Sequence, residues 1–124
     1  MPAKFEIDKL NRIVRSEAWG ELTPADLRDH RERLLAHPDF NPDFDQIIDF
    51  SDVTSVELTG GQIHSSTLDT LFSSKSRRAF VAPTPTVFGL ARMYETYYSM
   101  LENAASVRIF HDKSSALQWL ERDN

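Results

Sequence analysis

The chain has 124 residues, of which 40% are hydrophobic and 27% charged; this length and composition predict one compact domain, residues 1–124. Acidic residues outnumber basic ones by 19 to 14, so we expect no nucleic-acid partner, because contacts to phosphates dominate that affinity. The absence of cysteine excludes disulfides, thiolate catalysis and cysteine-based metal sites. The longest apolar runs have about four residues, so we expect no signal peptide, no membrane anchor and a cytoplasmic location.

The first forty residues predict a β-hairpin followed by a helix. Two strand-like runs, FEI and RIVRSEAW, flank the turn sequence DKLN, and the dipeptide WG closes this antiparallel pair. Thr23 is the expected N-cap of the helix, Asp26 its capping-box partner, and Pro38 the stop. These signals predict a helix from Pro24 to about Ala36, with proline at its first position.

The rest of the chain alternates between strand and helix patterns. DQIIDF predicts a strand, and Gly60–Phe72 has apolar residues at helical spacing. RRAFVAP predicts the next strand, and Thr84-Pro85 begins a long helix that runs to about Glu102. SVRIFHD predicts the last strand, and Asp112 is the expected cap of a final helix over SSALQWLERD. This order predicts an α/β fold with a mixed, mostly parallel sheet to which the hairpin adds one antiparallel strand.

The segments GELT, HPDF, IIDFSDV, VAPTPTVFGLARMYE and VRIFHD...ALQWL resemble a family of small, largely uncharacterised bacterial proteins related to the STAS domain. That domain is the fold of anti-sigma-factor antagonists and of the cytoplasmic ends of sulfate transporters. The likeness spans nearly the whole chain, and its most specific pieces are FGLARMYE and the closing F-x-D-x-x-x-A-x-x-W-L pattern. It implies a β-α superhelix whose parallel strands lie side by side in chain order.

The loop expected after IIDF is the first candidate site, and its residues of interest are Asp49, Ser51, Asp52, Glu57, Thr59 and Gly60. In antagonist-type STAS domains this loop runs through an aspartate to a phosphorylatable serine, then a second hydroxyl residue and a glycine. The resemblance puts Leu58 at the serine, between Glu57 and Thr59, and therefore implies that the phosphoserine switch is absent.

Ordinary structural roles also account for this loop. Thr59 is either a substitute phosphate acceptor or the N-cap of the following helix. Gly60 and Gly61 turn the chain into that helix, because TGGQ lacks the spacing and lysine of a nucleotide loop. The polar residues before them fit either a site at the end of a parallel strand or a plain turn.

No residue set predicts catalysis or metal binding. The four histidines lack ligand spacing, DFNPDFD lacks the oxygen ladder of a calcium loop, and no G-x-S-x-G elbow frames a serine. We therefore expect a non-enzymatic protein without a cofactor or metal.

The helix PTVFGLARMYETYYSMLE contains two rows of large side chains. A predicted core stripe consists of Val87, Ala91, Tyr94, Tyr98 and Leu101. A second row has the residue types of protein interfaces: Phe88, Arg92, Met93, Glu95, Tyr97 and Met100. This row predicts a homodimer through the helix. The alternatives are a wider buried arc and a surface ion pair between Arg92 and Glu95.

Two classes of function remain open. One is a STAS-like interaction or regulatory module that binds a protein partner. The other is a binder of a small apolar or acyl ligand, because STAS folds are structurally similar to lipid-carrying SEC14-like domains. An enclosed apolar cavity of roughly 300 Å³ beneath Tyr94 and Tyr98 favours the ligand, whereas a filled core with an exposed apolar patch favours the partner.

Overall fold

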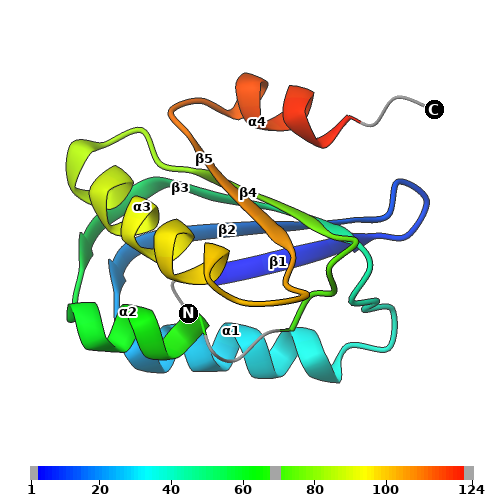
Figure 1. Cartoon of the computed structure of the whole chain (residues 1–124), viewed down its shortest axis with the longest axis horizontal. Coiled ribbons are helices and arrows are strands. Elements are labelled where there is room, and N and C mark those ends of the chain that lie inside the picture. Colours follow the sequence, from blue (N-terminus) through cyan, green and yellow to red (C-terminus); the bar gives the residue numbers. More distant parts are fainter. Residues whose placement is uncertain (1–2, 68–70, 122–124) are drawn as a thin grey trace.

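The computed structural model describes residues 3–67 and 71–121 of the chain (Figure 1). The elements follow one another as β1 (Ala3–Asp8), β2 (Ile13–Leu22), α1 (Pro24–Ala36), β3 (Asp45–Val56), α2 (Gly60–Thr67), β4 (Arg77–Val81), α3 (Pro85–Ser99), β5 (Ser106–Phe110) and α4 (Lys113–Leu120). The described strands form one sheet, with α1, α2 and α3 on one face and α4 on the other (Figure 1).

The sheet has the predicted mixed topology. Its strand order is β1-β2-β3-β4-β5; β1 is antiparallel to β2, and the remaining neighbours are parallel. The predicted α/β fold and the chain-order arrangement of the strands are therefore confirmed. The hairpin is antiparallel because a short turn joins its strands, whereas each later pair is connected through a helix.

β2 extends beyond the point where the sequence suggested that the hairpin closes. Trp19 and Gly20 lie inside the strand, which continues to Leu22. The register with β3 shifts between Glu17 and Trp19 and again after Gly20, whose φ is +68°. Glycine adopts this conformation without a Cβ penalty, so the strand bulges here instead of ending.

β3 is also longer than predicted. The prediction that it ends at Phe50 is wrong, because the strand runs on to Val56. The extended part of β2 supplies parallel partners for it, with Trp19 opposite Asp52 and Leu22 opposite Val56. Much of the expected loop is therefore strand, because paired backbone groups outweigh the local turn preference of its polar residues.

The helices match their sequence signals best at their starts. α1 begins with the predicted capping box, in which the Asp26 amide donates to Thr23 Oγ1 (3.3 Å) and the Thr23 amide donates to Asp26 Oδ2 (2.9 Å). The start of α4 is capped by Asp112, which accepts from the Ser115 amide at 2.7 Å. Thr84 occupies the N-cap position of α3 but makes no side-chain cap hydrogen bond.

Two helix ends differ from the prediction. α2 is described over Gly60–Thr67, and the predicted end at Phe72 is wrong because Leu71 and Phe72 are not helical, Phe72 being buried outside the helix; Leu68 lies outside the described residues. α3 ends at Ser99 and not at Glu102. Within the described part of the chain, no helix is long and apolar enough to cross a membrane.

Apolar packing differs on the two faces of the sheet. Ala116 and Leu120 of α4 pack with Ile47 and Ala79 on one face, while Leu117 stays 38% exposed, so α4 buries a narrower stripe than its sequence suggested. The opposite face carries larger aromatic clusters beneath α1, α2 and α3. Polar side chains are buried among these aromatics, and they form the site described next.

Candidate functional site

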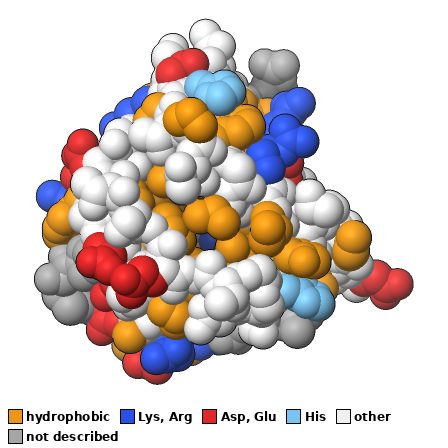
Figure 2. Space-filling model, turned by 90° about the vertical axis from the view of Figure 1, so that its left-hand side faces the viewer, with side chains coloured by type: hydrophobic (Ala, Val, Ile, Leu, Met, Phe, Trp, Pro, Cys, Tyr) orange, Lys and Arg blue, Asp and Glu red, His pale blue; other side chains and the backbone are white. Residues whose placement is uncertain are grey.

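A pocket of about 190 Å³ lies between the sheet and helices α1, α2 and α3. Its floor is formed by side chains of β3 and β4, and its walls by side chains of the three helices and the end of β2; the apolar lining includes Leu22, Leu27, Ile48, Phe50, Phe80 and Val87. The pocket is partly open to solvent. Figure 2 shows a hollow among hydrophobic side chains, with a basic side chain visible at its bottom.

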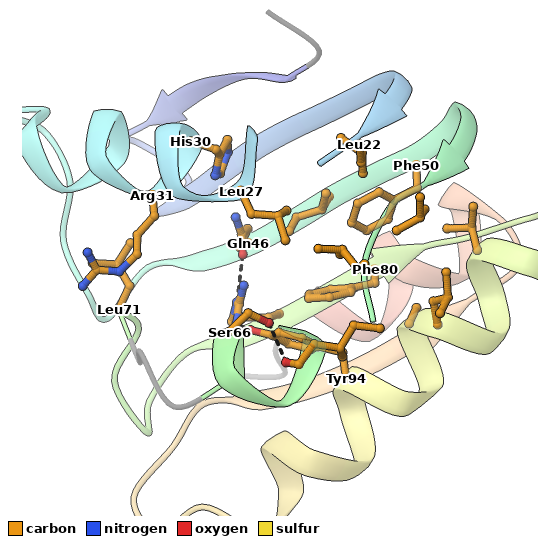
Figure 3. A pocket seen from close by; sticks show the side chains of 18 of the residues that line it. Leu22, Leu27, His30, Arg31, Gln46, Phe50, Ser66, Leu71, Phe80 and Tyr94 are labelled. Atoms are coloured by element: carbon orange, nitrogen blue, oxygen red, sulfur yellow. Dashed lines mark hydrogen bonds between the residues drawn. The ribbon is translucent and has the colours of Figure 1, made fainter. Parts of the chain in front are cut away.

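Four polar side chains of the lining belong to one hydrogen-bonded chain. Arg78 of β4 donates from Nε to Gln46 Oε1 (2.8 Å) and from Nη1 to the Tyr94 hydroxyl (2.9 Å). Gln46 Nε2 donates to Ser16 Oγ at 3.2 Å, and Ser16 Oγ lies 3.1 Å from His30 Nε2. Figure 3 shows Gln46 facing the pocket, with a dashed line marking its bond to the arginine. The network joins β2, β3 and β4 to helices α1 and α3.

The direction of each hydrogen bond follows from Arg78. A guanidinium group only donates, so it must face the amide oxygen of Gln46, and the amide nitrogen then faces Ser16. Because Ser16 Oγ accepts this bond, its own proton is available for His30 Nε2. A neutral His30 that carries its proton on Nδ1 completes the network.

Burial keeps His30 in that neutral form. His30 belongs to α1, and its imidazole packs against the ring of Phe5, with the ring centroids 5.5 Å apart. Loss of hydration, and then the positive charges of Arg33 and Arg78, lower the pKa of His30 to about 4, against a smaller opposing effect of Asp29. At neutral pH the side chain is therefore an uncharged acceptor for Ser16.

The guanidinium of Arg78 sits in an aromatic cage. Its central carbon lies between 4.9 and 5.7 Å from the ring centroids of Phe72, Phe80, Tyr94 and Tyr98. Burial works against the charged form, but the phenol groups of Tyr94 and Tyr98 outweigh it and the pKa of Arg78 is raised. Among the described residues, no acidic side chain forms an ion pair with Arg78.

The polar residues expected after IIDF do not gather around this pocket. Asp49, Ser51 and Asp52 lie within β3, where the Asp49 carboxylate accepts from the Ser51 amide at 2.9 Å. Ser51 and Asp52 are exposed. None of the three lines the pocket between the sheet and the helices.

The second half of that segment joins β3 to α2. Thr59 and Gln62 form a capping box, since the Gln62 amide donates to Thr59 Oγ1 (3.1 Å) and the Thr59 amide donates to Gln62 Oε1 (2.9 Å). The N-cap interpretation of Thr59 is confirmed, and Gly60 begins the helix. Glu57 is exposed, and a hydrogen bond with Glu21 raises its pKa. Leu58, at the position that matches the family's serine, forms part of the pocket wall.

The second row of α3 has intramolecular partners. Phe88 stacks on His111 with ring centroids 4.1 Å apart, and Tyr97 stacks on His64 at 4.4 Å. Arg92 and Glu95 form an ion pair within the helix, as the surface-pair alternative predicts, with Nε and Oε1 3.1 Å apart. Met93 and Met100 are 37% and 72% exposed. The predicted dimer surface is therefore smaller than the sequence suggested, because two histidines outside α3 cover its aromatic rings.

Sequence reasoning missed the network of Ser16, His30, Gln46 and Arg78. A signal was present in the strand alternation, because Gln46 shares a strand face with Ile48 and Phe50, and Arg78 shares one with Phe80. Gln46 and Arg78 are also partners in the register of β3 and β4. Polar residues at inward positions of two neighbouring strands indicate a buried polar site.

The fold has a counterpart among solved structures. No family model matches the chain, and no curated protein sequence matches it. It is similar to the crystal structure of an uncharacterised protein from the DUF3478 family with a SpoIIAA-like fold, from Shewanella loihica PV-4. The TM-score is 0.62 at 18% sequence identity, over 95% of this chain and 93% of that chain. This likeness confirms the STAS-like fold, and at this identity it shows the fold alone.

Proposed function

We propose that this protein binds a small compound with an apolar body in the pocket between the sheet and helices α1, α2 and α3. The observation that carries the proposal is the pocket itself, an apolar and partly open space with a few convergent polar groups, which is the usual anatomy of a small-molecule site. Its place on the helix-covered face of the sheet lets three helices and three strands contact one ligand.

The size of the pocket limits the ligand. At about 190 Å³ and open on one side, it does not reach the enclosed 300 Å³ that would favour a lipid or long acyl chain. An apolar cavity of about 150 Å³ binds benzene, so the pocket suits a compound of roughly six to ten non-hydrogen atoms. The structure therefore supports the ligand-binding alternative in a reduced form, for a compound much smaller than a lipid.

The chemistry of the site favours binding over catalysis. Ser16 and His30 have the spacing of a nucleophile and a general base, but Ser16 is buried and is not part of the pocket lining. Its oxygen also accepts a hydrogen bond from Gln46, which lowers its nucleophilicity. The pair therefore serves to hold Gln46, and we propose a non-enzymatic role.

The proposal can be tested by following backbone amide resonances of the protein during titration with toluene, cyclohexanol and indole. Binding should shift resonances of residues that line the pocket. Replacing Ala91, which is buried in the lining, with leucine fills part of the space and should abolish these shifts. Ala25→Leu, at an exposed position of α1, is the matched control and should preserve them. The proposal would be contradicted if the shifts persisted in Ala91→Leu. It would also be contradicted if none of the three compounds shifted a resonance of a residue that lines the pocket.

A protein-interaction role is the second candidate. Exposed Met93 and Met100 on one side of α3 favour it, because methionine adapts to varied partner surfaces. In this role the chain pairs with a second copy or with another protein through α3. A serine-phosphorylation switch has no part in either role, because Leu58 occupies the matching position and its side chain forms part of the pocket wall.

A further inference from the structure

We infer that the ligand is a small monocarboxylate whose carboxylate pairs with the guanidinium of Arg78 inside the pocket. This inference rests on the proposed function and names the chemical class of the compound. It is supported by the charge of the lining, the hydrogen bonds that Arg78 makes, and the arrangement of apolar groups around it.

The described lining of the pocket contains a cation although the protein as a whole is acidic. The formal net charge of the chain is −5, yet the described residues of the lining include Arg78 and no aspartate or glutamate. A cation among mostly apolar side chains creates a local potential that attracts an anion.

The hydrogen-bond partners of Arg78 are not acidic side chains. Gln46 and Tyr94 accept one hydrogen bond each, from Nε and Nη1, and neither is an aspartate or glutamate. A half-buried cation without a carboxylate partner is costly, and a carboxylate would offset part of that cost. The four aromatic rings around the guanidinium limit its hydration but do not neutralise it.

The guanidinium has more N–H groups than its bonds to Gln46 and Tyr94 use. These two bonds use one N–H on Nε and one on Nη1, whereas a guanidinium has five N–H groups in a planar fork that matches two carboxylate oxygens. The bonds to Gln46 and Tyr94 fix the plane of this fork, so the two residues are positioning residues. The Gln46 amide is itself held by Ser16 and His30, which makes the whole network a support for one cation.

The pocket also offers apolar contacts to the rest of the ligand. Phe72 and Phe80, which flank the guanidinium, also line the pocket. A compound whose carboxylate reaches Arg78 therefore lays its apolar body against Phe80, Ile48 and the helices. The volume of about 190 Å³ fits an aromatic or short aliphatic acid of roughly eight to ten non-hydrogen atoms.

The test uses acids and their primary amides, which have the same number of non-hydrogen atoms: benzoate with benzamide, and hexanoate with hexanamide. Their affinities are measured at neutral pH by isothermal titration or by amide resonances of the pocket. The wild-type protein should bind each acid about tenfold or more tightly than its amide, because a charge-assisted hydrogen bond is stronger than a neutral one. The Arg78 Nε–H resonance should shift with the acid and much less with the amide.

Arg78→Met removes the cation and keeps an unbranched apolar side chain, so it should bind the amides and lose the preference for the acids. Arg78→Lys keeps the charge and should retain part of that preference. If Arg78→Met does not fold, the Nε–H resonance of the wild-type protein still decides the outcome. Equal affinity for acids and amides, or an acid preference that persists in folded Arg78→Met, overturns the carboxylate inference and leaves the proposed function intact. If toluene, cyclohexanol and indole also fail to bind, the proposed function fails as well.

Discussion

His30 should make the protein less stable as the pH falls from about 6.5 toward 4. In the folded chain burial lowers the pKa of His30 to about 4, whereas the unfolded chain has the ordinary value near 6.5. Between these values the unfolded state binds the proton more tightly, so the free energy of unfolding rises with pH and is lost on acidification. Well above pH 6.5, as at pH 7.5, the histidine is neutral in both states and this contribution is complete.

The size of the effect follows from the two pKa values. A shift from 6.5 to about 4 corresponds to about 3 kcal/mol in full, of which about 2 kcal/mol is lost by pH 5. The imidazole is partly exposed, so these values are upper limits. Protonation also removes the acceptor for Ser16, which links the loss of stability to the network that holds Gln46.

Urea unfolding at pH 7.5 and at pH 5.0 measures this loss, and His30→Gln provides the comparison. Glutamine keeps an acceptor oxygen but does not titrate, so the variant should lose less stability than the wild type over this interval, by up to about 2 kcal/mol. The other three histidines and all carboxylates are common to both proteins and cancel in the difference. Equal losses in the two proteins would refute the assigned environment of His30.

Two further predictions concern the helix surface and the β3–α2 connection. If α3 forms a homodimer, light scattering after size exclusion should give a mass near twice 14.2 kDa at tens of micromolar, and Tyr97→Glu should reduce it to one copy by placing an unpaired charge in the contact. A wild-type mass near 14 kDa would exclude the dimer. Incubation with an anti-sigma-type kinase should leave the connection unmodified, because Leu58 has no hydroxyl group and the Thr59 hydroxyl is engaged as the N-cap of α2. Stoichiometric phosphate on Thr59, detected by mass spectrometry, would overturn this expectation.

Local sequence signals were sufficient to predict those features of the structure that depend on residues close together in the sequence. The capping box of Thr23 and Asp26 and the proline that follows Thr23 define the start of α1, since all of their hydrogen bonds lie within four residues. The cap of α4 at Asp112 is equally local. Alternating strand and helix patterns were likewise sufficient for the mixed sheet, because crossover connections restrict the possible topologies.

The length of β3 could not be predicted from local sequence signals. Ser51 and Asp52 have turn-forming side chains, yet both are in β3 because β2 continues beside them through the register shift between Glu17 and Trp19. Whether a polar segment pairs or loops out depends on a partner strand that is distant in sequence. The stacking of His111 on Phe88 and of His64 on Tyr97 could not be predicted for the same reason, because both histidines come from other parts of the chain.

The sequence by itself determined the order of elements, the helix starts and the mixed α/β class, because propensity, capping and periodicity act over a few residues. Only the tertiary structure decided the site. Ser16, His30, Gln46, Arg78 and Tyr94 lie on five different elements, and none has a partner within its own segment that marks it as functional. They form one network because the parallel register places Gln46 beside Arg78 and because α1 and α3 pack over the same face of the sheet.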